Sequence, residues 1–152
     1  NWDWWYEETW KNIPLRNGCT GIDLDAKQLA RIGYLFLNNG KWRDDQLISS
    51  EWIKEATKSQ VSLFAPIADT DRKNTIGNGR YGYNWWVKGI ADDMPDIPDG
   101  TYFMSGLNNN VCFEIPEWNM VFVRMGDDYN PPEGKRNVYN QFFKEFSKAI
   151  IN

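Results

Sequence analysis

The clearest helical pattern in the chain begins near residue 25. Its apolar residues recur at the spacing of one helix face, namely Leu29, Ile32, Leu35 and Phe36. Asp25 followed three residues later by Gln28 is a capping-box pattern, which predicts that the helix begins there. The run Asn38-Asn39-Gly40 predicts its end, because Asn and Gly tolerate the left-handed backbone that closes helices.

A second helix is expected after a hairpin-like stretch over residues 40–48. Ser49 or Ser50 is the candidate N-cap, because a hydroxyl oxygen can accept from the first free N–H groups of a helix. Glu51 lies in the first turn, where the helix dipole favours an anion. Trp52 occupies a helical position that we expect to face the core.

The second half of the chain predicts a sheet. The expected strands cover residues 81–87, 101–105, 111–115 and 120–125. The last two are joined by Pro116-Glu117-Trp118-Asn119, a good hairpin turn. The run Met120-Val121-Phe122-Val123 is apolar without alternation, which is typical of a strand inside a sheet that is covered on both faces.

A last helix should lie on this sheet, because its apolar residues share one stripe. They are Val138, Phe142, Phe146 and Ile150, with Tyr139 and Phe143 beside them. Residues 1–20 are aromatic and polar without a clean period, and we interpret them as an irregular opening segment. Residues 61–80 and 92–100 have loop composition. The fold class expected is α+β, with an antiparallel sheet flanked by helices.

The composition of the chain narrows the range of possible functions. The chain has 152 residues, which fits one domain or a piece of a larger one, and it begins with neither an initiator Met nor a signal-peptide pattern. We therefore expect a processed or cut chain. A net charge of -4 without any basic run argues against nucleic-acid binding. No apolar stretch approaches the ~20 residues of a membrane span.

The absence of histidine excludes several chemistries. With His 0, the chain by itself contains no Ser-His-Asp or Cys-His arrangement and no mixed His/Cys zinc site. Cys19 and Cys112 are read as small buried hydrophobes, although one disulfide between them stays open. The acidic pairs 92–93 and 127–128 lack the spacing of a calcium loop and are read as solvated loops. We expect no metal and no cofactor.

Four stretches resemble one known family. Residues 21–33 are similar to the "GL-S-T-A-x-D-L-A-R-I-G" helix start of the serine β-lactamase, D-Ala-D-Ala carboxypeptidase and esterase family. The other three follow in the family's order. Residues 35–54 resemble its "LYLNGG…QLIP-x-SW-x-x-E" stretch, residues 81–86 its "YGYGWW" strand, and residues 103–124 its "F-x-A-x-G…IPE-x-x-L-V-V-V-R" hairpin.

The resemblance implies the C-terminal part (residues 1–152) of a β-lactamase/transpeptidase-like α/β sandwich. The family's nucleophile is the Ser of a Ser-x-x-Lys motif, and a Tyr-x-Asn or Ser-Asp-Asn motif lines the cleft. Neither pattern occurs here, and in the family both lie upstream of the matched region. The upstream part of the same protein is therefore the expected partner. No catalytic residue is assigned to this chain, which should be inactive alone.

The family's third motif, Lys-Thr-Gly, does fall within the chain. Met104-Ser105-Gly106 stands in its place, and Met cannot supply the cation that holds a substrate carboxylate. The departure suits the esterase, amidase or 6-aminohexanoate-oligomer hydrolase branches, which implies a small amide or ester as substrate. The resemblance assigns an oxyanion N–H to Leu107 and makes Ser105, Gly106, Leu107 and Asn108 the candidate substrate-binding residues.

Simpler interpretations of these residues stay open. Ser105 can be a plain strand hydroxyl, and Asn108-Asn109-Asn110 a simple turn that tolerates positive φ. Nine tryptophans also suit a non-catalytic carbohydrate- or peptidoglycan-binding module, although most of them are expected in the core. The resemblance favours the periplasm or cell envelope as the compartment.

Overall fold

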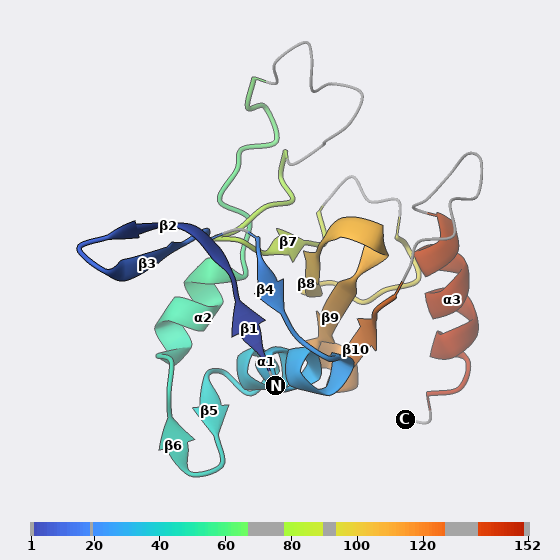
Figure 1. The fold of residues 1–152 in the computed structure, drawn as a ribbon. Helices are drawn as coiled ribbons and strands as arrows, with labels where there is room; N and C mark the ends of the chain where they lie inside the picture. The colour runs from blue at the N-terminus through green and yellow to red at the C-terminus, as the bar shows by residue number, and fades with distance from the viewer. Residues whose placement is uncertain (1, 19, 67–77, 90–93, 127–136, 151–152) are drawn as a thin grey trace.

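A computed structural model describes residues 2–18, 20–66, 78–89, 94–126 and 137–150. Its central element is a four-stranded antiparallel sheet of order β10–β9–β8–β7, shown in Figure 1. The strands are β7 (Trp86–Val87), β8 (Tyr102–Ser105), β9 (Val111–Ile115) and β10 (Met120–Arg124). β9 is one of the two inner strands, and all five of its residues are buried. The expected α+β class with an antiparallel sheet is confirmed.

Helices cover both faces of the sheet (Figure 1). On one face, α1 (Ala26–Leu37) approaches β9 and β10 closely at Gly33, while α2 (Ser50–Ala56) contributes Ala56 to a core cluster with Trp85 and Tyr102. On the other face, α3 (Asn137–Ser147) buries Phe143 against Phe113. Apolar burial on both sides of β9 makes this sandwich the main source of stability.

The two predicted helix starts are confirmed. Asp25 Oδ1 accepts from the Gln28 N–H at 2.8 Å, and Gln28 Oε1 accepts from the Asp25 N–H at 2.9 Å, so the capping box is complete. Ser49, the first of the two candidates, caps α2 by accepting from the Trp52 N–H. The predicted stop is also confirmed, since α1 ends at Leu37, Asn38 is its C-cap, and the positive φ of Gly40 (80°) follows within three residues.

The irregular opening segment expected over residues 1–20 is wrong for the described residues. They form β1 (Asp3–Trp4), β2 (Tyr6–Trp10) and β3 (Ile13–Arg16), with β4 (Ile22–Asp23) pairing with β1. Lys11 and Asn12 both adopt positive φ and make a tight turn between β2 and β3. The Trp4 indole N–H donates to the carbonyls of Asn17 and Thr20, which ties the segment together. The β2–β3 hairpin projects away from the sheet (Figure 1).

The strand expected over residues 81–87 is much shorter. Asn84 has a φ of 61°, and the Gly82 N–H donates to Trp85 O at 2.8 Å, so a tight turn occupies most of this stretch. Only β7 joins the sheet. Trp52, expected in the core, is 51% exposed and stacks on Tyr83 with ring centroids 5.5 Å apart. The docking of α2 through Ile53 and Ala56 turns Trp52 outward.

Two packing expectations also need correction. Among the described strands, β10 lies at the edge of the sheet rather than inside it, although α1 covers one face and Phe122 meets Phe143 of α3 on the other. α3 lies on the sheet as expected, but Phe143 is the buried centre of its stripe, and Phe142 contacts Phe122 of β10 while remaining 39% exposed. Ile150 lies beyond the end of the helix.

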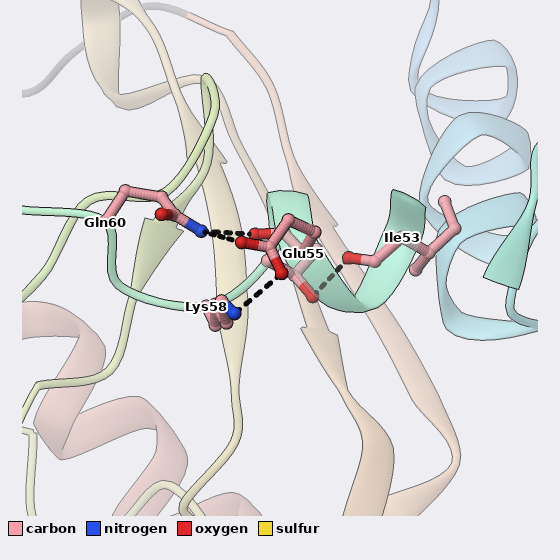
Figure 2. Close-up of polar contacts among 5 residues, drawn as sticks. Ile53, Glu55, Lys58 and Gln60 are labelled. Carbon is pink, nitrogen blue, oxygen red and sulfur yellow. Dashed lines mark hydrogen bonds and ion pairs between the residues drawn. The ribbon is translucent and has the colours of Figure 1, made fainter. Parts of the chain in front are cut away.

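The end of α2 is fastened to the segment that follows it. Lys58 Nζ lies 2.6 Å from Glu55 Oε2, and Gln60 Nε2 donates to both the carbonyl and the side chain of Glu55 (Figure 2). The hydrogen bond and charge of Lys58 hold the pKa of Glu55 below its usual value. The Gln60 N–H also donates to Tyr81 O at 2.8 Å, so this network connects α2 to the turn before β7.

Candidate functional site

The candidate substrate-binding residues lie together where β8 leaves the sheet. Ser105 is the last residue of β8, pairs with Val111 of β9, and is exposed. Gly106 continues the extended backbone with φ −119° and ψ −175°. A Cβ built on Gly106 would have only Asn110 O nearby, at 3.6 Å, so the space beside this backbone is open. The sequence brings the four residues together because they are consecutive on a sharp turn.

The turn itself is a short 3-10 segment, Leu107–Asn109. Asn108 has φ 57° and Asn109 has φ 53°, so the expectation that this asparagine run tolerates positive φ is confirmed. The Asn110 N–H donates to Leu107 O at 3.1 Å, and the Gly106 N–H donates to Asn110 O at 2.8 Å. These two bonds close the turn.

The N–H of Leu107 is left out of this arrangement. Among the described residues it donates to no acceptor, and the Leu107 side chain is 86% exposed. A free N–H beside a glycine with open space is the geometry that an oxygen of a ligand requires of a backbone donor. Within the described part of the chain, no hydrogen bond links the Ser105 hydroxyl to a basic group, so Ser105 lacks the partner that activates a nucleophile.

Side chains from two distant elements reach the same turn. Arg124 Nη1, from the end of β10, donates to the carbonyls of Asn108 and Asn109, the second at 3.1 Å. The hydroxyl of Tyr139 in α3 donates to Asn109 O at 3.3 Å. Neither contact was predicted from the sequence. Arg124 carried two signals, a charged residue at the end of an apolar strand and the last position of the family-like hairpin pattern.

A buried carboxyl lies between the sheet and α1. Glu114 of β9 is 0% exposed, and Cys112 Sγ donates to its Oε1 at 3.0 Å. Its Oε2 accepts no hydrogen bond from the described residues. Removal from water raises the pKa of Glu114 to about 8, and the same burial raises the pKa of Cys112 and Tyr102 well above their usual values. Glu114 was the one charged residue in a run read as apolar.

Two hollows lie elsewhere on the described surface. One, of about 270 Å³, lies in the N-terminal strands between Trp5, Tyr6, Leu15 and Arg16. The other, of about 490 Å³, lies between α2 and the turn at Pro116, at the opposite end of β9 from Ser105. Four tryptophans are exposed, namely Trp2, Trp5, Trp10 and Trp52. The other five of the nine are buried or half-buried, so the expectation that most tryptophans are packed is confirmed, although only Trp85 among them is fully buried.

Further sequence expectations can be placed as follows. The described residues hold no cluster of three or more His, Cys, Asp or Glu able to bind a metal, and no described helix is long and apolar enough to span a membrane. Cys112 is a free, buried thiol, while Cys19 lies outside the described residues. The acidic pairs 92–93 and 127–128 and most of the 61–80 loop also lie outside them.

Comparison with solved structures gives the fold. The chain is similar to the "Putative 6-aminohexanoate-dimer hydrolase from Bacillus anthracis", with a TM-score of 0.58, 19% sequence identity, and coverage of 85% of this chain and 30% of that one. The two proteins therefore share the α+β fold over the matched part. At this identity the likeness is one of fold.

The sequence is also similar to that of a longer protein. An uncharacterized protein of Alkalihalophilus pseudofirmus is 26% identical over 117 residues, which are 73% of this chain and 32% of that protein. The chain thus spans about a third of the length of both similar proteins. No profile of a known protein family matches it.

Proposed function

We propose that this chain is the C-terminal part of a serine hydrolase of the β-lactamase-like family. In this proposal, an upstream part of the same protein supplies the Ser-x-x-Lys nucleophile and its activating groups, and the two parts together transfer the acyl group of a small amide or ester. The resemblance of four ordered stretches and the fold shared with the Bacillus anthracis protein support the proposal.

One observation carries the site assignment. The N–H of Leu107 donates to no acceptor among the described residues, whereas the N–H groups of Gly106 and Asn110, which close the turn, are paired. In acyl transfer, such a donor stabilises the oxygen that becomes negatively charged in the transition state, and one donor contributes roughly 3 kcal/mol. Ser105 and Asn108 flank this position and would contact the rest of the substrate.

The substrate class follows from the residue that precedes Ser105. Met104 stands where the family's lysine binds a substrate carboxylate, and a thioether carries no positive charge. A substrate without a carboxylate at that point, such as a simple ester or a linear amide, loses nothing by this change. We therefore expect ester and amide hydrolysis to exceed β-lactam hydrolysis in the complete protein.

The 152-residue chain alone should hydrolyse nothing. Acyl transfer needs a nucleophile with a base within hydrogen-bond reach, and the described residues offer Ser105 no such partner. Incubation with nitrocefin and with p-nitrophenyl esters should give the rate of buffer. Turnover above buffer that disappears in Ser105→Ala would contradict the proposal. A longer gene product that carries an upstream Ser-x-x-Lys should hydrolyse at least one ester.

Gly106→Val in that longer product should lower turnover far more than stability. The backbone of Gly106 is extended, which suits a β-branched residue, and the added Cβ would meet only Asn110 O at ordinary contact distance. The new methyl groups would instead occupy the space of the substrate, with an expected loss of about 100-fold in kcat/KM. Gly18→Val is the matched control, because a Cβ at Gly18 meets nothing within 4 Å and lies far along the chain from the site. Equal turnover in both variants would remove the site from this turn.

The second candidate function is a carbohydrate-binding module. The exposed Trp5 and Trp10 on the N-terminal strands favour it, because flat aromatic side chains in water stack on sugar rings. Sedimentation of the chain with insoluble peptidoglycan or chitin, compared with Trp10→Ala, separates the two functions. Retention that depends on Trp10, with no hydrolysis by the longer product, would favour the binding module.

A further inference from the structure

The turn after β8 has an energetically unfavourable backbone conformation. Asn108 and Asn109 are consecutive residues with left-handed backbone, at φ 57° and φ 53°. Asparagine tolerates this region better than most L-residues, but two such residues in succession still raise the energy of the turn, so contacts that fix them stabilise it. Asn108 is exposed and Asn109 is half-buried, so burial of the Asn108 side chain does not supply the fixing. The contacts of their carbonyls do.

Arg124 provides most of these contacts from across the sheet. Arg124 pairs with Val111, and Val111 pairs with Ser105, so the three residues form one row over β10, β9 and β8. From the end of this row, Arg124 Nη1 donates to the carbonyls of Asn108, Asn109 and Gly126. Charge-assisted hydrogen bonds are the stronger kind, and one guanidinium nitrogen here connects two successive peptide units of the turn.

Two further contacts hold the turn from the same side. Tyr139 donates its hydroxyl to Asn109 O, and the Gly126 N–H donates to Asn110 Oδ1 at 2.9 Å. The carbonyl oxygens of Asn108 and Asn109 are therefore engaged with donors of β10 and α3. A free carbonyl oxygen facing the Leu107 N–H would repel the negative charge that develops on a substrate oxygen there. Holding the carbonyls toward Arg124 removes that repulsion and fixes the direction of the peptide units beside the donor.

We propose that Arg124 is a positioning residue, which keeps the turn Leu107–Asn109 in the conformation that presents the Leu107 N–H to a substrate oxygen. The catalytic part of this proposal rests on the proposed function, whereas the structural part does not. Tyr139 acts as a secondary support at Asn109. The role belongs to the guanidinium as a multiple donor, so lysine in its place restores the charge and only part of the hydrogen bonding.

The structural part is tested on the 152-residue chain by amide hydrogen exchange. Arg124→Met should speed exchange of the Gly106 and Asn110 amides, which close the turn, by about 10-fold or more, since charge-assisted bonds are lost. The amides of β9 should exchange as before. Arg31→Met, which removes an exposed arginine of α1, is the charge-matched control and should change neither set. Unchanged exchange at Gly106 and Asn110 would overturn the proposal.

The catalytic part is tested on the longer gene product. Arg124→Met should lower kcat by about 100-fold with KM nearly unchanged, because an oxyanion donor acts in the transition state rather than on bound substrate. Arg124→Lys should recover part of this loss, and Tyr139→Phe should cost less than Arg124→Met. A purely structural role would instead reduce the amount of folded enzyme and leave kcat per folded molecule unchanged.

The exchange and kinetic experiments together distinguish a failure of the positioning role from a failure of the proposed function. Faster exchange at the turn together with an unchanged kcat would show that Arg124 holds the turn but that Leu107 is not the oxyanion donor. That result overturns the catalytic role. A longer product without hydrolase activity overturns the proposed function, and the exchange arm then still decides whether Arg124 holds the turn.

Discussion

Replacing Glu114 with glutamine should remove most of the fall in stability that the protein shows between pH 5 and pH 8. The folded-state pKa of Glu114 is raised to about 8 from an ordinary value of 4.5. Below pH 4.5 the carboxyl is protonated in both folded and unfolded chains. Above it, the unfolded chain releases the proton while the folded chain retains it, so the free energy of unfolding falls by about 1 kcal/mol per pH unit until pH 8.

The pKa of Glu114 is raised because its carboxyl is removed from water and gains too few hydrogen bonds to stabilise the charged form. Glu114 is 0% exposed, Cys112 donates to one of its oxygens, and the other accepts nothing from the described residues. Ionising the carboxyl in this place is costly, and glutamine avoids the cost because it has no charge to bury. Glutamine leaves an amide group in a site with few partners, so at pH 5 the variant should be no more stable than the parent.

Urea unfolding at pH 5, 6, 7 and 8 measures how the free energy of unfolding changes with pH in the parent and in Glu114→Gln. The comparison is clean because the chain has His 0, so no histidine titrates in this range. Glu145→Gln is the control: the pKa of Glu145 is held low by Lys148, so this carboxyl stays ionised throughout the range and its loss should not alter the slope. Parallel slopes for the parent and Glu114→Gln would mean that Glu114 is ionised in the folded chain.

Gly40→Ala should destabilise the fold by about 3 kcal/mol or more, which is the second large effect we expect. Gly40 has φ 80°, and a Cβ built there would lie 2.0 Å from Ile48 O. That carbonyl belongs to the backbone and cannot swing away as a side chain would. The Gly40 carbonyl also accepts from the N–H groups of Leu47 and Ile48, so the clash falls on the junction between α1 and the strands that lead to α2.

Gly100→Ala separates backbone strain from the clash. Gly100 has nearly the same φ, 79°, but a Cβ there meets nothing within 4 Å. It should therefore cost only the strain of a left-handed alanine, about 1–2 kcal/mol. Chemical denaturation of both variants, with thermal unfolding as a second probe, gives the comparison. Equal losses at Gly40 and Gly100 would mean that the junction between α1 and β5 (Lys41–Trp42) relaxes freely around the new methyl group.

The sequence by itself determined the elements whose signals are local. A capping box needs only Asp25 and Gln28, and both of its hydrogen bonds are present. The Pro116–Asn119 turn joins two apolar runs that pair residue for residue as β9 and β10. The position of Ser105, Gly106, Leu107 and Asn108 on one turn followed as well, since consecutive residues cannot be separated by folding. The α+β class came from these elements and their order.

Only the tertiary structure decided what depends on contacts between distant residues. The hairpin of β2 and β3 escaped prediction because its strands have no clean alternation, and their pairing across the Lys11-Asn12 turn is what makes them strands. Trp52 lies outside the core because α2 docks through Ile53 and Ala56. Glu114 is buried because α1 comes within contact of the sheet at Gly33, and Arg124 reaches Asn108 from 16 residues away. Periodicity reports which residues are apolar, but the packing of layers decides which polar atoms lose water and which donors they find.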